Sequence, residues 1–135
     1  MSETARVKLE HVNLTVSNPE KTAAALCAMF DWRIRWQGLA ASGGQTIHVG
    51  GEDDYLAVYT DTRPGQPFTQ KRYAKGAPLN HIGVVVPDLE AAEARVAAAG
   101  FRPFGHGAYE PGRRFYFLDD DGIEFEVVSY APPPR

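Results

Sequence analysis

Two histidines and a glutamate have the types and the placement that a divalent metal site needs. His11 and His81 stand 70 positions apart, at the same point of two similar segments, LEHVNLTVSNPEKTAAAL and LNHIGVVVPDLEAAEARV. Near the C-terminal end, the run DGIEFEVVSY carries Glu126. Two imidazoles and one carboxylate form a ligand set for Fe(II), Mn(II), Ni(II), Co(II) or Zn(II), and they leave coordination positions open for water or substrate. The residues therefore predict a divalent metal ion as cofactor, without selecting among these metals.

The alternation of residue types predicts which strand faces carry these ligands. Each histidine alternates with apolar residues at the period of a β-strand, so it lies opposite the apolar face that a helix would cover. In the C-terminal run, Glu124 and Glu126 share one face, and the apolar residues between them share the other. A carboxylate inside a sheet is costly without a cation. We expect Glu126, nearer the middle of the strand, to be the ligand, and Glu124, nearer the turn, to reach water.

Each of the two similar segments predicts a strand followed by a helix. Asn18 is a suitable N-cap before Pro19 in the first copy, and Asp88 is the N-cap in the second, where Gly100 ends the helix. Turn-rich pieces then separate three further strands in each copy. The predicted strands span residues 33–38, 45–50 and 55–60 in the first copy, and 102–109, 113–119 and 123–130 in the second.

This order predicts a single α+β domain over residues 1–135, built from two β-α-β-β-β modules in tandem. The modules span residues 7–60 and 79–130, and the polar, Pro- and Gly-containing segment 61–78 is the linker between them. We expect the modules to form a curved mixed sheet around a cleft, with both helices on the outside.

Composition excludes several classes of protein. The chain has 135 residues and a formal net charge of −3, which argues against nucleic acid as a partner. No apolar run approaches the length of a membrane span, and MSETARVK lacks the apolar core of a signal peptide. Cys27 is the single cysteine, which fits a reducing, cytoplasmic setting. We expect a small-molecule substrate as the partner, because the predicted metal site leaves coordination positions open for one.

Residues 7–130 resemble the vicinal oxygen chelate superfamily, which includes glyoxalases, bleomycin-resistance proteins, fosfomycin-resistance proteins and extradiol dioxygenases. The resemblance rests on LEHVNLTV, LNHIGVVVPDLEAAEARVAAAGF and FYFLDDDGIEFEVV. It implies a cleft with metal ligands from the first and last strands, and it assigns that role to His11, His81 and Glu126. Some members take a fourth ligand from the last strand of the first module, where this chain has Ala57, or Leu56 if the alignment shifts by one. The resemblance thus implies the three-ligand branch of the superfamily.

The same resemblance implies a homodimer, and it leaves open whether each site lies within one chain or is shared between two. In the shared case, His11 of one chain would join His81 and Glu126 of the other.

Further residues are candidates for substrate chemistry, each with a structural alternative. Tyr116 stands ten residues before Glu126, an offset similar to that of a tyrosine in extradiol dioxygenases, and is either catalytic or a lining aromatic. His48 is a candidate general acid or base, or a hydrogen-bonded structural histidine. Arg114 is a candidate for binding an anionic substrate group, in competition with Arg113, or is a solvated arginine after a tight turn. Trp36 and Tyr59, with Tyr55, are candidate aromatic walls of the cleft or core residues. His106, between glycines, lies either on a lid or on a surface loop.

Two functions of different classes follow from these residues. The first is a metal-dependent enzyme, a lyase or isomerase, dioxygenase or thiol transferase, acting on a small oxygen-bearing substrate that chelates the metal. The alternative is a metal-free protein of the bleomycin-resistance kind, which sequesters a small molecule or antibiotic in the same cleft. The sequence names neither the substrate nor the reaction.

Overall fold

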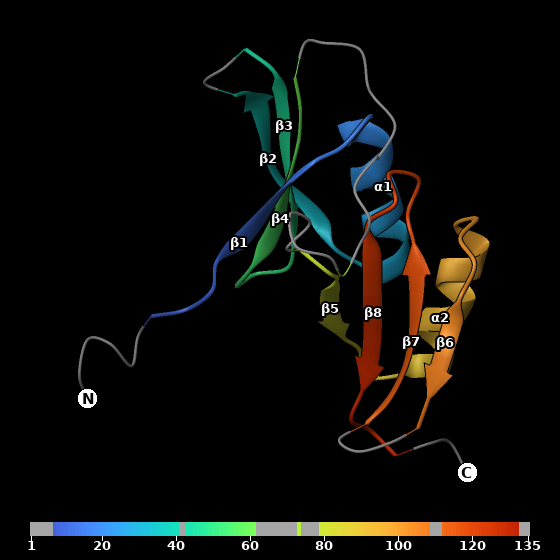
Figure 1. The fold of residues 1–135 in the computed structure, drawn as a ribbon. Coiled ribbons are helices and arrows are strands. Elements are labelled where there is room, and N and C mark those ends of the chain that lie inside the picture. Colours follow the sequence, from blue (N-terminus) through green and yellow to red (C-terminus); the bar gives the residue numbers. More distant parts are fainter. Residues whose placement is uncertain (1–6, 41–42, 62–72, 74–78, 109–111, 133–135) are drawn as a thin grey trace. The chain divides into compact units, whose positions relative to one another are not determined.

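The chain consists of two compact units, Met1–Gly65 and Gln66–Arg135. The computed structural model describes residues 7–40, 43–61, 73, 79–108 and 112–132 (Figure 1). The predicted linker, 61–78, lies outside these described residues except for Asp61 and Tyr73. Each unit repeats the order β-α-β-β-β.

The first unit is a four-stranded mixed sheet with one helix. Its elements are β1 (His11–Thr15), α1 (Pro19–Phe30), β2 (Arg33–Leu39), β3 (Gln45–Gly50) and β4 (Tyr55–Thr60). The strands lie in the order β1-β4-β3-β2, with β1 parallel to β4 and the other pairs antiparallel. The last strand of the unit therefore lies directly beside the first, and α1 packs mainly on β3 and β4.

The second unit has the same topology. Its elements are β5 (Ile82–Val85), α2 (Leu89–Ala98), β6 (Phe104–Gly107), β7 (Arg113–Leu118) and β8 (Glu124–Ser129). The strands lie in the order β5-β8-β7-β6, with β5 parallel to β8, and α2 packs on β7 and β8. The predicted α+β class is confirmed, with two mixed sheets and two helices. The predicted cleft between the modules stays a prediction.

Both helices begin where the sequence predicts, and α2 ends where the sequence predicts. The Asn18 side chain accepts a hydrogen bond from the backbone N–H of Lys21, and Asp88 accepts one from Ala91. Gly100 follows α2 with a φ of 96°, a left-handed conformation that glycine adopts without strain. Its N–H donates to Ala97 and the N–H of Phe101 donates to Val96, which together satisfy the last carbonyls of the helix.

One face of each sheet forms a hydrophobic core with its helix, and the other face carries the histidine. In the first unit the buried residues of the helix side are Leu14, Ala23, Leu26, Met29, Ile47, Val49, Leu56 and Val58. In the second they are Val84, Leu89, Ala92, Val96, Phe115, Phe117, Phe125 and Val127. The alternation in the sequence predicted this division because successive strand residues point to opposite faces.

The prediction for β6 is wrong in its length: the strand is four residues, where the sequence indicated eight. Gly105 has a φ of 66°, and the register with β7 shifts between Phe104 and Gly107. Within the described residues, neither helix is long and apolar enough to cross a membrane.

Candidate metal centre

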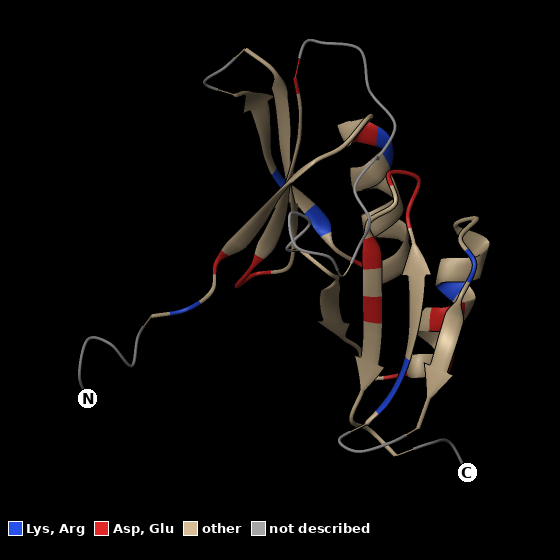
Figure 2. Cartoon of the chain, viewed as in Figure 1, with Lys and Arg blue, Asp and Glu red and all other residues tan. Residues whose placement is uncertain are grey.

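The strand order of the second unit brings its candidate site residues together. Because β8 lies between β5 and β7, Glu126 pairs with Gly83 on one side and with Tyr116 on the other. His81 immediately precedes β5, and Arg114 lies on β7 on the same face as Tyr116. Figure 2 shows the two acidic positions of β8 as red bands on that strand.

The closest approach between candidate ligands is between His81 and Glu126. The His81 Nε2 atom lies 3.3 Å from Oε2 of Glu126. Two ligand atoms that are each ~2.1 Å from one metal ion stand about 3.0 Å apart at an octahedral angle and about 3.4 Å apart at a tetrahedral one. The separation therefore fits two neighbouring ligands of a divalent cation, and imidazole nitrogen with carboxylate oxygen suits Mn, Fe, Ni, Co or Zn.

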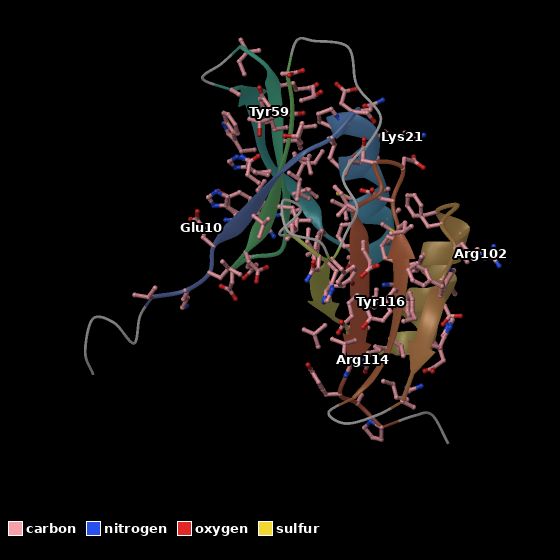
Figure 3. All side chains as sticks on the ribbon, viewed as in Figure 1. Glu10, Lys21, Tyr59, Arg102, Arg114 and Tyr116 are labelled. Carbon is pink, nitrogen blue, oxygen red and sulfur yellow. The ribbon has the colours of Figure 1, made fainter. Side chains whose placement is uncertain are left out.

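Two further side chains hold the carboxylate of Glu126. Arg114 donates from Nη1 to Oε1 at 3.0 Å, and the Tyr116 hydroxyl donates to Oε2 at 3.0 Å. Figure 3 labels Arg114 and Tyr116. The Arg114 and Glu126 side chains are 11% and 14% exposed, so this ion pair is largely buried. It fixes the orientation of the carboxylate and supplies a positive charge where a buried negative charge would otherwise be costly.

Arg113 and Arg114 lie on opposite faces of β7. Arg113 points to the helix side of the sheet, where its guanidinium donates to both carboxylate oxygens of Glu90 on α2. This bond lowers the pKa of Glu90. Arg114 therefore is the arginine that shares a face with Glu126.

The expectation that Glu124 reaches water is wrong. Glu124 is 7% exposed, its Oε2 accepts a hydrogen bond from the Tyr73 hydroxyl, and the same oxygen lies 3.7 Å from Nδ1 of His81. The Tyr73 hydroxyl is also 3.4 Å from that nitrogen. Sequence reasoning missed Tyr73 because it lies in the segment interpreted as an exposed linker.

In the first unit, a row of stacked and tilted rings crosses all four strands. Tyr55 lies between two stacked imidazoles, with ring centroids 4.9 Å from His11 and 4.5 Å from His48. The Trp36 ring lies 5.1 Å from that of His48, and the Arg35 guanidinium lies 4.7 Å above the Tyr55 ring. Desolvation, with the charges of His11 and Arg35, lowers the pKa of His48, which favours its neutral form.

Glu10 contacts His11, the residue at the β1 end of this row of rings. Its Oε1 lies 2.8 Å from Nδ1 of His11 and accepts a bond of 3.3 Å from the Tyr55 hydroxyl. The bond from His11 lowers the pKa of Glu10, whereas desolvation and the nearby carboxylate raise the pKa of Tyr55. The sequence pattern did not single out Glu10, because consecutive strand residues normally point to opposite faces.

The pairing registers relate the two units position by position. Ala57 pairs with Asn13 as Glu126 pairs with Gly83, so Ala57 occupies in the first unit the place of Glu126 in the second. By the same register His48, which pairs with Ala57, stands where Tyr116 stands in the second unit. No fourth ligand is available at Ala57, since alanine has no donor atom.

The remaining candidates are divided between the faces. Trp36, which is 50% exposed, and half-buried Tyr59 share the His11 and His48 face. His106 lies 2.8 Å from a carboxylate oxygen of Glu93 on α2, so it faces the helix.

Within the described residues, no three His, Cys, Asp or Glu side chains form a metal-binding group.

Comparison with protein families defines the class. The sequence model of the Glyoxalase/Bleomycin resistance protein/Dioxygenase superfamily matches residues 10–117, and the chain belongs to this superfamily. The matched range contains His11 and His81 but ends before Glu126. The proposal of Glu126 as a metal ligand therefore rests on the local geometry and the sequence pattern. A search of curated proteins found no match.

Solved structures of the superfamily share the fold. The fosfomycin resistance protein FosX from Mesorhizobium loti is 24% identical, with a TM-score of 0.69 over 95% of this chain and 92% of that one. A glyoxylase/bleomycin resistance protein/dioxygenase domain from Frankia sp. is 21% identical, with a TM-score of 0.75 over 91% of each chain. FosX from Listeria monocytogenes, in a complex with Mn(II) and sulfate, is 21% identical, with a TM-score of 0.68 over 90% of this chain and 91% of that one.

Proposed function

We propose that this protein is a metal-dependent enzyme whose divalent cation is held by His11, His81 and Glu126. The observation that carries the proposal is the 3.3 Å separation between His81 Nε2 and Glu126 Oε2, which suits two ligands of one ion. The second unit supplies these two donors, and His11 would come from the first unit of the same chain or of a second copy. A homodimer in the cytoplasm is the proposed setting.

The residues around Glu126 have distinct proposed roles. A bound divalent cation would act as a Lewis acid on a substrate oxygen. Arg114 and Tyr116 hold the carboxylate from its two oxygens. We propose that the Tyr116 hydroxyl donates its proton to a substrate oxygen instead of to Glu126 when a substrate is bound. Tyr116 is thus a proposed catalytic residue.

His48 is the proposed general base of the first unit. Its lowered pKa favours the neutral imidazole, which is the form that accepts a proton. Trp36 and Tyr59 lie on the same face and are the proposed contacts for the apolar part of a substrate, while Arg114 is the proposed contact for an anionic group.

A small molecule that offers oxygen atoms to the cation is the proposed substrate class. The Listeria monocytogenes FosX structures include complexes with Mn(II) and sulfate, and with Mn(II) and 1S,2S-dihydroxypropylphosphonic acid. These similar structures support a divalent metal and a small oxygen-rich ligand. Ring-opening dioxygenation, isomerisation and addition to an epoxide are the reactions to test.

A specific observation favours the alternative of metal-free binding. The Arg114 guanidinium already balances the charge of Glu126, and the Tyr116 hydroxyl already donates to it. With these partners the carboxylate is stable without a cation, as a protein that only sequesters a small molecule would require.

Metal analysis separates the two functions. The purified protein is expected to carry or take up about one divalent ion per site, measured by plasma mass spectrometry and by titration calorimetry after chelation. His81→Ala and Glu126→Gln should each weaken uptake strongly, by roughly 100-fold or more. His106→Ala is the matched control, because that histidine bonds to Glu93 on the helix side. Equal metal uptake by the wild type and both site variants, or metal uptake by none of them, overturns the proposal of a metal-dependent enzyme.

Activity and site sharing need separate experiments. The metal-loaded protein is assayed with catechols by oxygen uptake, and with fosfomycin by loss of the epoxide in the presence of water or thiol. Mixing apo His11→Ala chains with apo Glu126→Gln chains restores one intact site per dimer if sites are shared. It restores none if each site lies within one chain.

A further inference from the structure

The Nδ1 atom of His11 is held by a side chain that no sequence pattern assigns to the site. Glu10 Oε1 lies 2.8 Å from this nitrogen, although Glu10 and His11 are neighbours in the chain. The carboxylate of Glu10 therefore turns back along the edge of the imidazole, at the start of β1, where Figure 3 labels it. The backbone of Glu10 is anchored, because its carbonyl accepts from the N–H of Tyr55 at 3.1 Å.

Tyr55 fixes the same pair from a second direction. Its hydroxyl donates to Oε1 of Glu10 at 3.3 Å, and its ring is stacked on that of His11 with an interplanar angle of 12°. The imidazole is thus restrained in its plane by the carboxylate and across its plane by the ring. One carboxylate oxygen accepts from both His11 and Tyr55, so the three side chains form one connected unit.

The second unit holds its own histidine in a related way. Nδ1 of His81 lies 3.4 Å from the Tyr73 hydroxyl and 3.7 Å from a carboxylate oxygen of Glu124. Its other nitrogen, Nε2, faces Glu126. In both units a glutamate oxygen therefore lies on the Nδ1 side and accepts a hydrogen bond from a tyrosine hydroxyl, and in the second unit the predicted partner ligand lies on the Nε2 side.

We propose that Glu10, supported by Tyr55, is a positioning residue that keeps His11 in the tautomer with the proton on Nδ1 and leaves Nε2 bare for a cation. The tautomer of a histidine is set by the hydrogen bond that its other nitrogen makes. A carboxylate on that side also raises the basicity of the ligating nitrogen and fixes the ring, and its loss typically weakens metal binding by about 10- to 100-fold. The proposal rests on the proposed function, in which His11 is a ligand.

Two measurements test it. Nitrogen-15 NMR of the metal-free protein, at a pH where His11 is neutral, reports its tautomer, with the His11 signals assigned from the spectrum of His11→Ala. The wild type is expected to carry the proton on Nδ1, and Glu10→Ala to shift it largely to Nε2. Titration calorimetry with Mn(II) should show a Kd about 10-fold to 100-fold higher in Glu10→Ala.

Matched variants exclude a general loss of charge or structure. Glu10→Gln keeps an oxygen that accepts from Nδ1–H and should retain the wild-type tautomer with a smaller rise in Kd. Tyr55→Phe keeps the stacked ring and loses only the hydroxyl, so its Kd should rise by a few-fold. Glu52→Ala removes a carboxylate from the turn between β3 and β4 and should change neither measurement. An unchanged tautomer in Glu10→Ala, or a rise in Kd equal to that of Glu52→Ala, overturns the proposal.

Failure of this inference is distinguishable from failure of the proposed function. If His11→Ala abolishes Mn(II) binding while Glu10→Ala leaves tautomer and Kd unchanged, His11 is a ligand and Glu10 does not position it. If His11→Ala leaves Mn(II) binding unchanged, the proposed ligand set itself is wrong.

Discussion

Replacing Arg114 by methionine tests how the charge of Glu126 is balanced. The substitution keeps most of the apolar stem of the side chain and removes the guanidinium that lies 3.0 Å from Oε1 of Glu126. It leaves the Glu126 carboxylate, which is 14% exposed, with the Tyr116 hydroxyl as its remaining hydrogen-bond donor on β7. We expect the variant to be much less stable than the wild type only when no cation is bound.

The magnitude follows from the burial of the pair. Removing one partner of a buried ion pair typically costs about 3–5 kcal/mol, because the other charge is left uncompensated. The bond from Tyr116 and the residual exposure reduce this, so we expect about 2–3 kcal/mol. For a chain of 135 residues this lowers the Tm by about 8–12 °C. With a divalent cation on Glu126, the cation replaces the lost positive charge, and the expected loss falls below about 1 kcal/mol.

Thermodynamic linkage gives a second, independent expectation. If the variant loses about 2 kcal/mol less with metal than without it, the variant must bind the cation more tightly by the same free energy. A difference of about 2 kcal/mol corresponds to a Kd about 30-fold lower. Arg114→Met would then be less stable when metal-free but would bind metal more strongly than the wild type.

Thermal unfolding followed by circular dichroism, in EDTA and at a fixed free Mn(II) concentration, measures the first effect, and calorimetry measures the second. Arg114→Met combined with Glu126→Gln is the control, because removing the carboxylate should restore most of the stability lost in EDTA. An equal loss of Tm with and without Mn(II) would show that the cation does not sit on Glu126. A loss below about 0.5 kcal/mol in EDTA would show that Arg114 is not needed to balance that charge.

Two further predictions concern the turn before β8 and the ring of Trp36. Burial raises the pKa of Asp119 to about 6, so the folded state holds this proton more tightly than the unfolded state, and stability falls as pH rises from about 4 to above 6. Asp119→Asn keeps an oxygen that accepts from the N–H groups of Asp121 and Ile123. In thermal scans it should be more stable than the wild type by about 1–2 kcal/mol at pH 7.5 but not at pH 4. A stability difference that stays constant across this pH range would contradict this reasoning. A Cβ at Gly38 would lie 2.9 Å from Cζ2 of Trp36, so Gly38→Ala should displace the indole and change its fluorescence in a Trp32→Phe background. Gly51→Ala, whose Cβ would meet no atom within 4 Å, should leave that fluorescence unchanged.

Local chemistry made the starts of both helices and the end of α2 predictable. Asn18 and Asp88 accept from backbone N–H groups three residues ahead, and Gly100 takes the left-handed conformation that ends α2. These interactions lie within a few residues of each other in the chain, so the sequence contains all of their partners.

The faces of the strands were also predictable, because alternation is a pattern of neighbouring residues. Alternation places His11 and His81 away from the helices, and the repeat places Ala57 where the second unit has Glu126. The pattern did not predict the burial of Glu124, because the hydroxyl that donates to its carboxylate belongs to Tyr73, 51 positions earlier.

The sequence by itself determined the two modules, their helices, the apolar faces and the types of the candidate ligands. Tertiary structure alone decided that β8 lies between β5 and β7, which brings His81, Arg114 and Tyr116 to Glu126. It likewise decided that Glu10 turns to the Nδ1 side of His11 beneath the hydroxyl of Tyr55. The physical reason is that periodicity fixes the face on which a side chain lies, whereas its partners depend on strand order and register between segments distant in the chain.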